Sequence, residues 1–430
     1  MRLDKNGAKP SFDAEQQYAF DVLTSGRNVF LSGDAGTSKS YVTRQFISWC
    51  ADNHKNVVVT APTGIAALNI NGVTLHRAFK AHIGPIVDKL KEVSIVLKKA
   101  NVVIIDEISM CRMDLFDFIA KQIIYVNQLR RLKNASDIQV VVVGDFFQLP
   151  PVCVKDEKDV LNNYYGYDIG YGFAFQAKSW KACNFVNIVL KKSKRQKNGQ
   201  FIQYLNEARR GTVSSLNWFM QNSSKHEIKN AILLSGTNKA VNEKNRLELS
   251  KLNTKSKTYE ATEQGEVKDS DKMALDTLEL KIDARVMTLI NDRDGRFQNG
   301  SFGTVCELGS DYVVVGMDEG ERVKIEEYTW EILGYATVKE NGSSKVQRTK
   351  IGSFTQIPLK LAWAITIHKS QGQTYDIVNL NPYSWDCGQL YVALSRCKSV
   401  ENIYFTEPLR EKYLKTSKEV IDFYKSIGGY

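Results

Sequence analysis

Close pairs of cysteine are missing from this sequence, whose seven cysteines are scattered and odd in number. That pattern excludes the zinc ligand sets and redox pairs that depend on close spacing, and it favours a reducing compartment. No apolar run is long enough to span a bilayer, and the polar start has neither a signal-peptide core nor an arginine-rich amphipathic pattern. We therefore expect an intracellular, cytoplasmic protein with no membrane partner.

Low-complexity stretches and a separate carboxylate cluster are also missing, and the second absence argues against a nuclease. A length of 430 residues exceeds one ordinary core and predicts two or three domains. Lys and Arg outnumber Asp and Glu by 58 to 48, which gives a net charge of +10 and a pI near 9.0. This charge suits a partner with regularly spaced phosphates, although an ordinary basic protein can have it too.

Short β-branched runs alternate with helical stretches in the first part of the chain. The runs are NVFLSG, NVVVTAP, NVVIIDE and IQVVVVGD. This alternation predicts an α/β fold, in which helices cover both faces of a parallel sheet. Further along, NAILLSGTNKAVNEKN opens a second α/β unit, which the tail of the chain completes.

Two segments interrupt these units. A basic stretch at about 75–100 has no clear strand and is predicted to be an insertion. Residues 283–352 carry short strands and turns, as expected for a small β-barrel. The predicted domains are therefore 1–185, 186–282 together with 353–430, and the inserted 283–352.

The loop GDAGTSKS follows the first strand and opens a helix. It matches G-x-x-x-x-G-K-[ST] at all positions but one, and in this pattern backbone N–H groups surround the phosphates of a nucleotide. Lys39 is predicted to reach the β- and γ-phosphates of ATP, and the Ser40 hydroxyl to ligate Mg²⁺. The loop residues expected to bind ATP are Gly33, Ala35, Gly36, Thr37, Ser38, Lys39 and Ser40.

Ser38 stands where the pattern has its second glycine. The backbone at this position often needs a conformation that costs a residue with a side chain roughly 1–2 kcal/mol. Three outcomes stay open from the sequence: weaker ATP binding, a small dihedral adjustment, or an altered loop.

A pair of carboxylates ends the apolar strand NVVIIDE. Asp106 is predicted to hold the Mg²⁺ shell, and Glu107 to position or deprotonate the attacking water. The alternative, two solvated carboxylates at a strand end, is disfavoured by the nearby phosphate loop. Gln148, in GDFFQLPP after the next strand, is expected to sense the γ-phosphate.

Six motifs resemble, in order, those of superfamily 1, class B helicases: GDAGTSKS, TAPTGIAA, IIDEISM, GDFFQLPPV, ITIHKSQG and YVALSR. The sequence is most similar to the Pif-one helicase family, from about Phe12 to Phe405. The resemblance implies two RecA-like P-loop domains with ATP and Mg²⁺ between them, a strand-separating wedge at 75–100 and a barrel at 283–352. It also implies roles in DNA replication, repair, recombination or telomere maintenance.

Further site residues follow from this resemblance alone. Gln16 is expected to read adenine, Gly372 to contact the nucleotide, and Arg195 and Arg396 to face the γ-phosphate. The residues expected to line a track for single-stranded DNA are Thr60, Pro62, Thr63, His76, Thr366, His368 and Lys369. Phe79 offers a stacking surface for a base, although a packed aromatic side chain is the plainer interpretation.

We therefore expect an ATP-dependent DNA helicase that moves 5′ to 3′ along single-stranded DNA. Its substrates would be duplex or G-quadruplex DNA, and it would act as a monomer or as a pair of copies on DNA. Two alternatives stay open. One is a DNA-stimulated ATPase that remodels protein–DNA complexes, and the other is a DNA-binding module in which Ser38 impairs hydrolysis.

Overall fold

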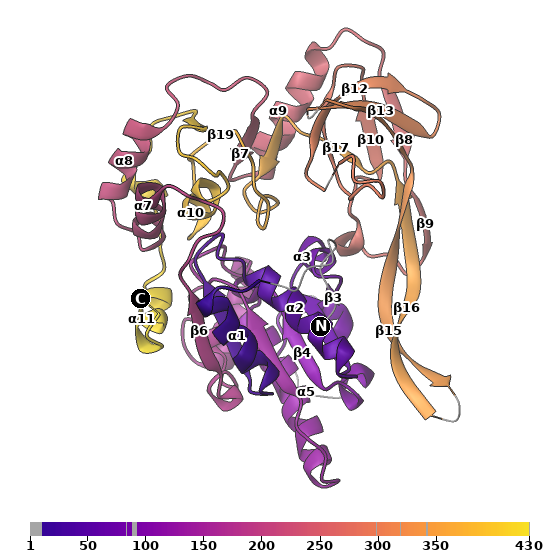
Figure 1. Ribbon diagram of the computed structural model, residues 1–430, viewed down its shortest axis with the longest axis vertical. Coiled ribbons are helices and arrows are strands. Elements are labelled where there is room, and N and C mark those ends of the chain that lie inside the picture. The colour runs from indigo at the N-terminus through magenta and orange to yellow at the C-terminus, as the bar shows by residue number, and fades with distance from the viewer. Residues whose placement is uncertain are drawn as a thin grey trace.

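The computed structural model describes residues 11–429, apart from 83, 88–92, 298, 319, 341 and 342. In this part of the chain the strands form two parallel sheets and three antiparallel ones, and the antiparallel strands gather on one side of the molecule, on the right in Figure 1. No helix among these residues is both long and apolar enough to cross a membrane.

The first parallel sheet has six strands in the order β3-β2-β4-β5-β1-β6. The strands are β1 (Val29–Gly33), β2 (Val57–Ala61), β3 (Val73–Thr74), β4 (Val102–Ile105), β5 (Gln139–Val143) and β6 (Val186–Leu190). Alternate residues enter two cores: Phe30 packs on the side of α5 (Met113–Arg131), and Val29 on the side of α1 (Ala14–Thr24) and α2 (Lys39–Asp52). Both faces are covered, which explains why the strands are almost wholly apolar.

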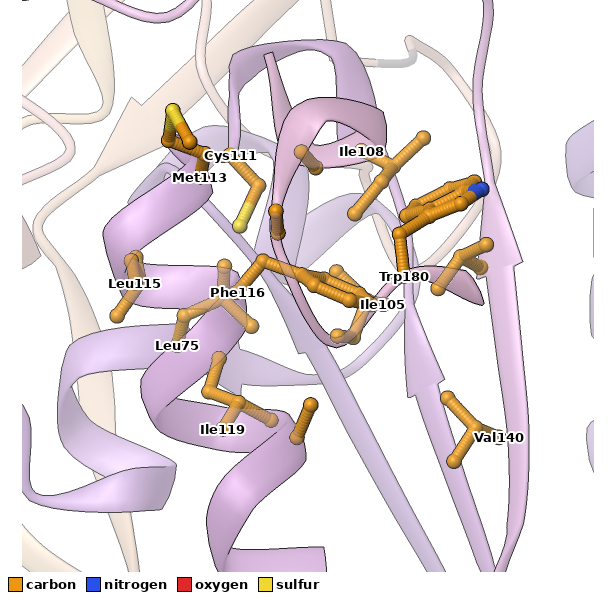
Figure 2. Packing of buried hydrophobic residues seen from close by; sticks show 14 of the residues in the cluster. Leu75, Ile105, Ile108, Cys111, Met113, Leu115, Phe116, Ile119, Val140 and Trp180 are labelled. Atoms are coloured by element: carbon orange, nitrogen blue, oxygen red, sulfur yellow. The ribbon is translucent and has the colours of Figure 1, made fainter. Parts of the chain in front are cut away.

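The core on the α5 side is dense in aromatic and branched side chains (Figure 2). Phe116 and Ile119 of α5 share this cluster with Ile105 and Val140 of the sheet. Trp180 packs against Phe116 with 5.1 Å between the ring centroids. Full burial of each such side chain contributes roughly 1.5–3 kcal/mol. The strand ends that carry the predicted catalytic loops are therefore held on a rigid base.

Part of the predicted insertion at 75–100 belongs to this same core. Helix α4 (Leu75–Phe79) and the 3₁₀ turn η1 (Ile95–Lys98) contribute buried side chains to it, while 83 and 88–92 lie outside the described residues. Phe79 is fully buried, so it is a packed aromatic side chain rather than an exposed stacking surface. The wedge role of this segment stays a prediction.

The second parallel sheet has the order β18-β7-β19-β20. Its strands are β7 (Ile232–Ser235), β18 (Ala364–Thr366), β19 (Val378–Leu380) and β20 (Ile403–Phe405). The helices of this region are α7 (Gly199–Arg209), α8 (Ser214–Asn222), α9 (Asn238–Lys251) and α10 (Gln389–Leu394). Phe201 of α7, Leu234 of β7 and Leu390 of α10 share one core, so these elements form a single packed domain.

Antiparallel strands lie between β7 and β18 in the sequence. They are β8 (Lys257–Glu260), β9 (Thr262–Gly265), β10 (Thr277–Leu280), β11 (Arg285–Thr288), β12 (Phe302–Leu308), β13 (Tyr312–Met317), β14 (Arg322–Glu326), β15 (Tyr328–Glu340), β16 (Ser343–Gln356) and β17 (Leu359–Leu361). Their sheets have the orders β14-β13-β12-β11-β17, β15-β16-β9 and β10-β8. Antiparallel pairing thus extends beyond 283–352 on both sides, because β8–β10 and β17 are too short to give a clear pattern in the sequence. The domain boundaries drawn from the sequence stay predictions.

The C-terminal helix α11 (Lys418–Ser426) returns to the first domain. Val420 and Tyr424 belong to the core on the α5 side, and Phe423 stacks on Phe175 with 4.3 Å between the centroids. The second domain is therefore tied to the first where the chain enters it and again where the chain leaves it. The remaining short elements are α3 (Gly64–Asn69), α6 (Lys155–Tyr165), η2 (Ile108–Met110), η3 (Ala174–Gln176), η4 (Lys181–Cys183), η5 (Asp269–Asp271) and η6 (Glu411–Tyr413).

Candidate active site

A cavity of about 400 Å³ lies where the loops of the first sheet meet the second domain. Its lining combines the phosphate loop, the carboxylate pair and basic side chains from both domains. The lining residues are Ala35, Gly36, Ser38, Lys39, Ser40, Asp106, Glu107, Gly144, Gln148, Lys194, Arg195, Gly372, Thr374, Arg396 and Lys398. The structure thus brings every predicted catalytic residue into one cavity, although these residues are far apart in the sequence.

The phosphate loop ends at Ser38, which caps the N-terminus of α2. Its φ of 66° and ψ of 32° are left-handed, and its side chain makes no capping hydrogen bond. The side chain of Lys39 folds back over the loop, where Nζ donates to the carbonyl oxygens of Gly33 at 2.8 Å and Asp34 at 3.1 Å. Burial lowers the pKa of Lys39. The loop therefore has the conformation that its pattern predicts, with a strained residue in place of glycine.

The carboxylate pair follows β4 directly. Burial, and then the charge of Glu107, raises the pKa of Asp106. Burial also raises the pKa of Glu107, against the charges of Lys39 and Arg396. Glu107 has a left-handed φ of 50°, a strain typical of functional positions. Oxygen ligands such as Asp106 and Ser40 are those that Mg²⁺ prefers, and a cation beside two crowded carboxylates would favour their charged forms. The residues present therefore fit a magnesium ion.

Two arginines reach the cavity from outside the first sheet. Arg195 Nη1 donates to the Ser395 carbonyl oxygen at 2.8 Å, and Arg396 Nε donates to that of Val392 at 2.7 Å. Neither forms an ion pair with a described residue. Burial, and then the charge of Arg396, lowers the pKa of Arg195 to about 9. Two crowded cations with neutral partners would be stabilised by an anion between them, as a γ-phosphate would be.

Gln371 links the two domains at the catalytic carboxylate. Its Nε2 donates to Glu107 Oε2 at 3.0 Å and to Gln148 Oε1 at 3.3 Å. Gln371 lies in the motif ITIHKSQG of the second domain, whereas Glu107 and Gln148 follow strands of the first. A change in the distance between the domains therefore acts directly on the residue predicted to activate water.

Three residues predicted to bind ATP do not line the cavity. Gln16 is buried at the start of α1, where its Oε1 accepts the Asp13 N–H at 3.2 Å. Thr37 Oγ1 donates to the Asp34 carbonyl oxygen at 2.9 Å. Gly33 packs so closely that an added Cβ would lie 2.5 Å from a backbone oxygen of β6. These residues shape the helix and the loop in this structure, and their contact with a nucleotide stays a prediction.

Comparison with known proteins decides the family of this chain. A family model described as PIF1-like helicase matches residues 11–218. The ATP-dependent DNA helicase Pif1 of Campylobacter jejuni is 33% identical over 93% of this chain and 94% of its own length. The chain belongs to the PIF1-like helicase family.

Solved structures of this family extend the match to three dimensions. Bacteroides sp. Pif1 in complex with ADP-AlF4 has a TM-score of 0.82 and 33% identity, and covers 98% of this chain and 99% of its own. The Bacteroides Pif1 complex with ADP-AlF3 and single-stranded DNA has a TM-score of 0.69 and 34% identity, with coverage of 98% and 99%. The predicted family and the α/β fold with a parallel P-loop sheet are confirmed.

The residues that the family resemblance places on the DNA track differ in exposure within the first domain. Pro62 and Thr63 are half-buried at the end of β2, and Thr63 Oγ1 accepts the Ala66 N–H at 3.3 Å. Thr60 is fully buried and donates its hydroxyl to the Ile104 carbonyl oxygen at 2.7 Å. In this structure the Thr60 hydroxyl therefore links two neighbouring strands of the sheet, β2 and β4. His76 is half-buried on α4, where burial lowers its pKa.

The track residues of the second domain lie together at the end of β18. Thr366 and Lys369 line a cavity of about 270 Å³ that also includes Lys360 of β17. His368 stacks on Trp385 with 6.2 Å between the ring centroids. The side chain of Lys360 forms no hydrogen bond or ion pair with a described residue, so this cavity offers cations to a phosphate. The DNA-binding roles of these residues stay a prediction.

Several cavity residues were missed from the sequence. Lys194 directly precedes Arg195, Lys398 lies two residues after Arg396, and Thr374 lies two residues after Gly372. Gln371, which contacts Glu107, directly precedes Gly372. The missed residues are therefore sequence neighbours of predicted ones. Their position within two residues of a predicted site residue was the available signal, since none of them has a residue type that singles it out.

Proposed function

We propose that this chain couples ATP hydrolysis to 5′-to-3′ movement along single-stranded DNA and thereby unwinds duplex and G-quadruplex DNA. As a member of the PIF1-like family it is an ATP-dependent DNA helicase. The direction and the folded DNA substrate are our proposal. One observation supports the motor mechanism. The phosphate loop and the carboxylates of the first domain share a cavity with Arg195 and Arg396, whose guanidinium groups donate hydrogen bonds to backbone carbonyls of the second domain.

The proposed mechanism assigns steps to the predicted catalytic residues. Lys39 leaves the loop carbonyls to neutralise the β- and γ-phosphates, and Glu107 takes a proton from the attacking water. Ser40 and Asp106 would hold Mg²⁺, which would supply charge neutralisation on the phosphates. Arg195 and Arg396 stabilise charge that develops on the γ-phosphate. Because Gln371 bonds to Glu107 and Gln148 from the second domain, closure of the cleft aligns the water.

Movement follows from alternating grip in this proposal. Pro62 and Thr63 hold the DNA backbone on the first domain, and His368 and Lys369 hold it on the second, so opening and closing shifts one grip relative to the other. Contacts to phosphates carry no sequence information, which suits a motor that must pass over any sequence. The proposed partner is single-stranded DNA next to a duplex, bound by one copy of the chain or by two at a fork. The same membership fits the predicted roles in replication, repair, recombination and telomere maintenance.

A second candidate is a DNA-binding module with impaired hydrolysis, and the left-handed Ser38 favours it. Steady-state ATP hydrolysis with and without single-stranded DNA separates the two. The proposal expects strong stimulation by DNA, which Glu107→Gln reduces by about 10²–10⁴. The exposed Glu411→Gln is a matched control and should behave as the parent. A parent chain that binds DNA without hydrolysing ATP would establish the second candidate.

Direction is tested with duplexes that carry a single-stranded tail at one end. A 5′ tail should support strand separation and a 3′ tail should not. Unwinding from the 3′ tail alone would refute the proposed direction. ATP-dependent stripping of a bound protein without strand separation would instead favour a motor that remodels protein–DNA complexes.

A further inference from the structure

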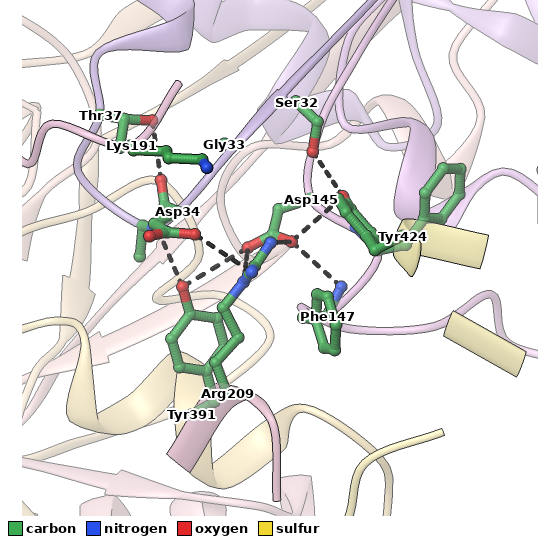
Figure 3. Close-up of polar contacts among 12 residues, drawn as sticks. Ser32, Gly33, Asp34, Thr37, Asp145, Phe147, Lys191, Arg209, Tyr391 and Tyr424 are labelled. Carbon is green, nitrogen blue, oxygen red and sulfur yellow. Dashed lines mark hydrogen bonds and ion pairs between the residues drawn. The ribbon is translucent and has the colours of Figure 1, made fainter. Parts of the chain in front are cut away.

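A buried ion-pair network joins the phosphate loop to the second domain (Figure 3). Its centre is Arg209, the last residue of α7, which is 3% exposed. Arg209 Nη1 lies 3.1 Å from Asp34 Oδ1, and Nη2 lies 2.8 Å from Asp145 Oδ1. Its guanidinium carbon also lies 4.1 Å from the centre of the Phe147 ring. One side chain of the second domain therefore holds two separate loops of the first.

Two tyrosines complete the network from other elements. Tyr391 of α10 accepts the Ala35 N–H at 2.8 Å, and its hydroxyl lies 3.4 Å from Asp145 Oδ2. Tyr424 of α11 donates to Asp145 Oδ1 at 3.4 Å and bonds to Ser32. Asp145 is fully buried and depends on these partners. The phosphate loop is thus contacted by the second domain at two successive residues, Asp34 and Ala35.

The burial of these charges requires the contact to persist while the domains move. Separating Arg209 from Asp145 would leave a fully buried carboxylate without its cation, which is far more costly than losing an exposed ion pair. Burial raises the pKa of Asp34, and the charge of Arg209 opposes this rise. A cleft that opened by breaking this network would pay these penalties in every cycle.

We propose that Arg209 is a positioning residue for ATP hydrolysis, which pins the phosphate loop to the second domain and forms the fixed point about which that domain closes. This role rests on the proposed function. Ala35 lines the cavity beside Asp34, and Gln148 lines it just after Asp145. The same guanidinium therefore holds both walls of the cavity in place. A lysine cannot replace it, because an ammonium group lacks the planar fork that bridges two carboxylates.

The test compares Arg209→Lys and Asp34→Asn with the parent, and uses Arg210→Lys on the exposed neighbouring residue as the matched control. The measurements are kcat and KM for ATP with single-stranded DNA, the Kd of a labelled oligothymidylate with and without ADP, and the Tm. We expect kcat to fall by about tenfold to 100-fold in both variants, since a small misplacement of reacting groups has effects of this size. The effect of ADP on the oligothymidylate Kd should shrink in both variants, while the Kd without ADP stays near that of the parent. The Tm should stay near that of the parent in Asp34→Asn, which keeps the pair between Arg209 and Asp145, and should fall in Arg209→Lys, which weakens it.

A purely structural role gives a different pattern. In Asp34→Asn the Tm and the fraction of active protein would then fall together, the ADP effect would be kept, and our inference would be overturned. If Arg209→Lys does not fold, Asp34→Asn decides, because it leaves the pair between Arg209 and Asp145 intact. Parent-like kcat in Asp34→Asn would then overturn the inference. A parent without DNA-stimulated hydrolysis would overturn the proposed function and, with it, the role that depends on it.

Discussion

Replacement of Ser38 by glycine should stabilise the protein. The left-handed conformation costs a residue with a Cβ roughly 1–2 kcal/mol, whereas glycine adopts it freely. Glycine in turn makes the unfolded chain more flexible, which offsets roughly 0.4–1 kcal/mol. Ser38 makes no capping hydrogen bond, so the substitution removes no compensating contact. The expected net gain for Ser38→Gly is therefore about 1 kcal/mol.

Thermal unfolding of Ser38→Gly, Ser38→Ala and the parent measures this gain. A gain of 1 kcal/mol raises Tm by about 2–4 °C for a cooperative unit of the size of the first domain. Ser38→Ala keeps the Cβ and removes only the hydroxyl, so it should unfold with the parent. An alanine variant that gains as much as the glycine variant would refute the argument from backbone strain.

Hydrolysis gives a second check on the same substitution. Relief of about 1 kcal/mol in the transition state can raise kcat/KM by no more than about fivefold. We therefore expect the parent to be an active ATPase and Ser38→Gly to be modestly faster. An inert parent beside an active Ser38→Gly would mean that the serine blocks the site, and the explanation by strain would be wrong.

Three further predictions follow from the geometry. Arg195→Ala should lower DNA-stimulated kcat by about 10³ or more, while the binding of a fluorescent ADP stays unchanged. Lys197→Ala, at an exposed neighbouring residue, is the control. A loss of kcat below tenfold in Arg195→Ala would show that Arg195 does not contact the γ-phosphate. Burial, and then the charge of Lys369, lowers the pKa of Lys360 to about 7. Because a phosphate binds only the charged lysine, the affinity of the parent for an oligothymidylate should fall as the pH rises through 7. Fluorescence anisotropy should show a flatter pH profile for Lys360→Arg, and identical profiles for the two proteins would exclude Lys360 from the track. Phe116→Ala should lower the free energy of unfolding by about 3–5 kcal/mol, because its ring is 1% exposed in the core beneath the catalytic loops. Denaturant titrations measure this loss, and a loss below about 1 kcal/mol would contradict that packing.

The sign of the Lys360 effect on stability is opposite to its effect on DNA binding. In the unfolded chain the pKa of the lysine has its ordinary value of 10.5, whereas in the folded chain it is about 7. The unfolded state therefore binds the proton more tightly between these values, and stability rises with pH from about 7 to 10.5. Comparison of Lys360→Met with the parent over this range should isolate the effect.

The first parallel sheet could be predicted because its strands are buried on both faces. Apolar runs such as Val102–Ile105 are continuous, and each is followed by the polar residues that the strand end presents. The catalytic residues of the loops were predictable for the same reason, since parallel strands bring their carboxyl ends to one edge. The strands β8–β10 and β17 were missed because each has only three or four residues and at least part of each is exposed, so none gives a clear apolar pattern.

Side chains that serve the fold cannot be separated from functional ones by a motif. Thr60 and Gln16 occupy motif positions, yet in this structure Thr60 bonds within the sheet and Gln16 caps α1. Both uses satisfy a buried polar group, which is the same physical need that a ligand would meet. Only the geometry distinguishes a hydroxyl that faces a strand from one that faces a cleft.

The network around Asp145 shows why the remaining parts of the site were beyond sequence reasoning. Asp34, Arg209 and Tyr424 are single polar residues in different segments, and nothing in the sequence distinguishes the buried Arg209 from the adjacent, exposed Arg210. The chain fold alone brings them together, at distances of 2.8 Å and 3.1 Å between Arg209 and its two carboxylates. The cost of burying these charges is met only when all partners are present, so the network requires the phosphate loop, the second domain and the C-terminal helix to be assembled at once. Helix α11 should therefore be needed for nucleotide binding even though it lines no part of the cavity.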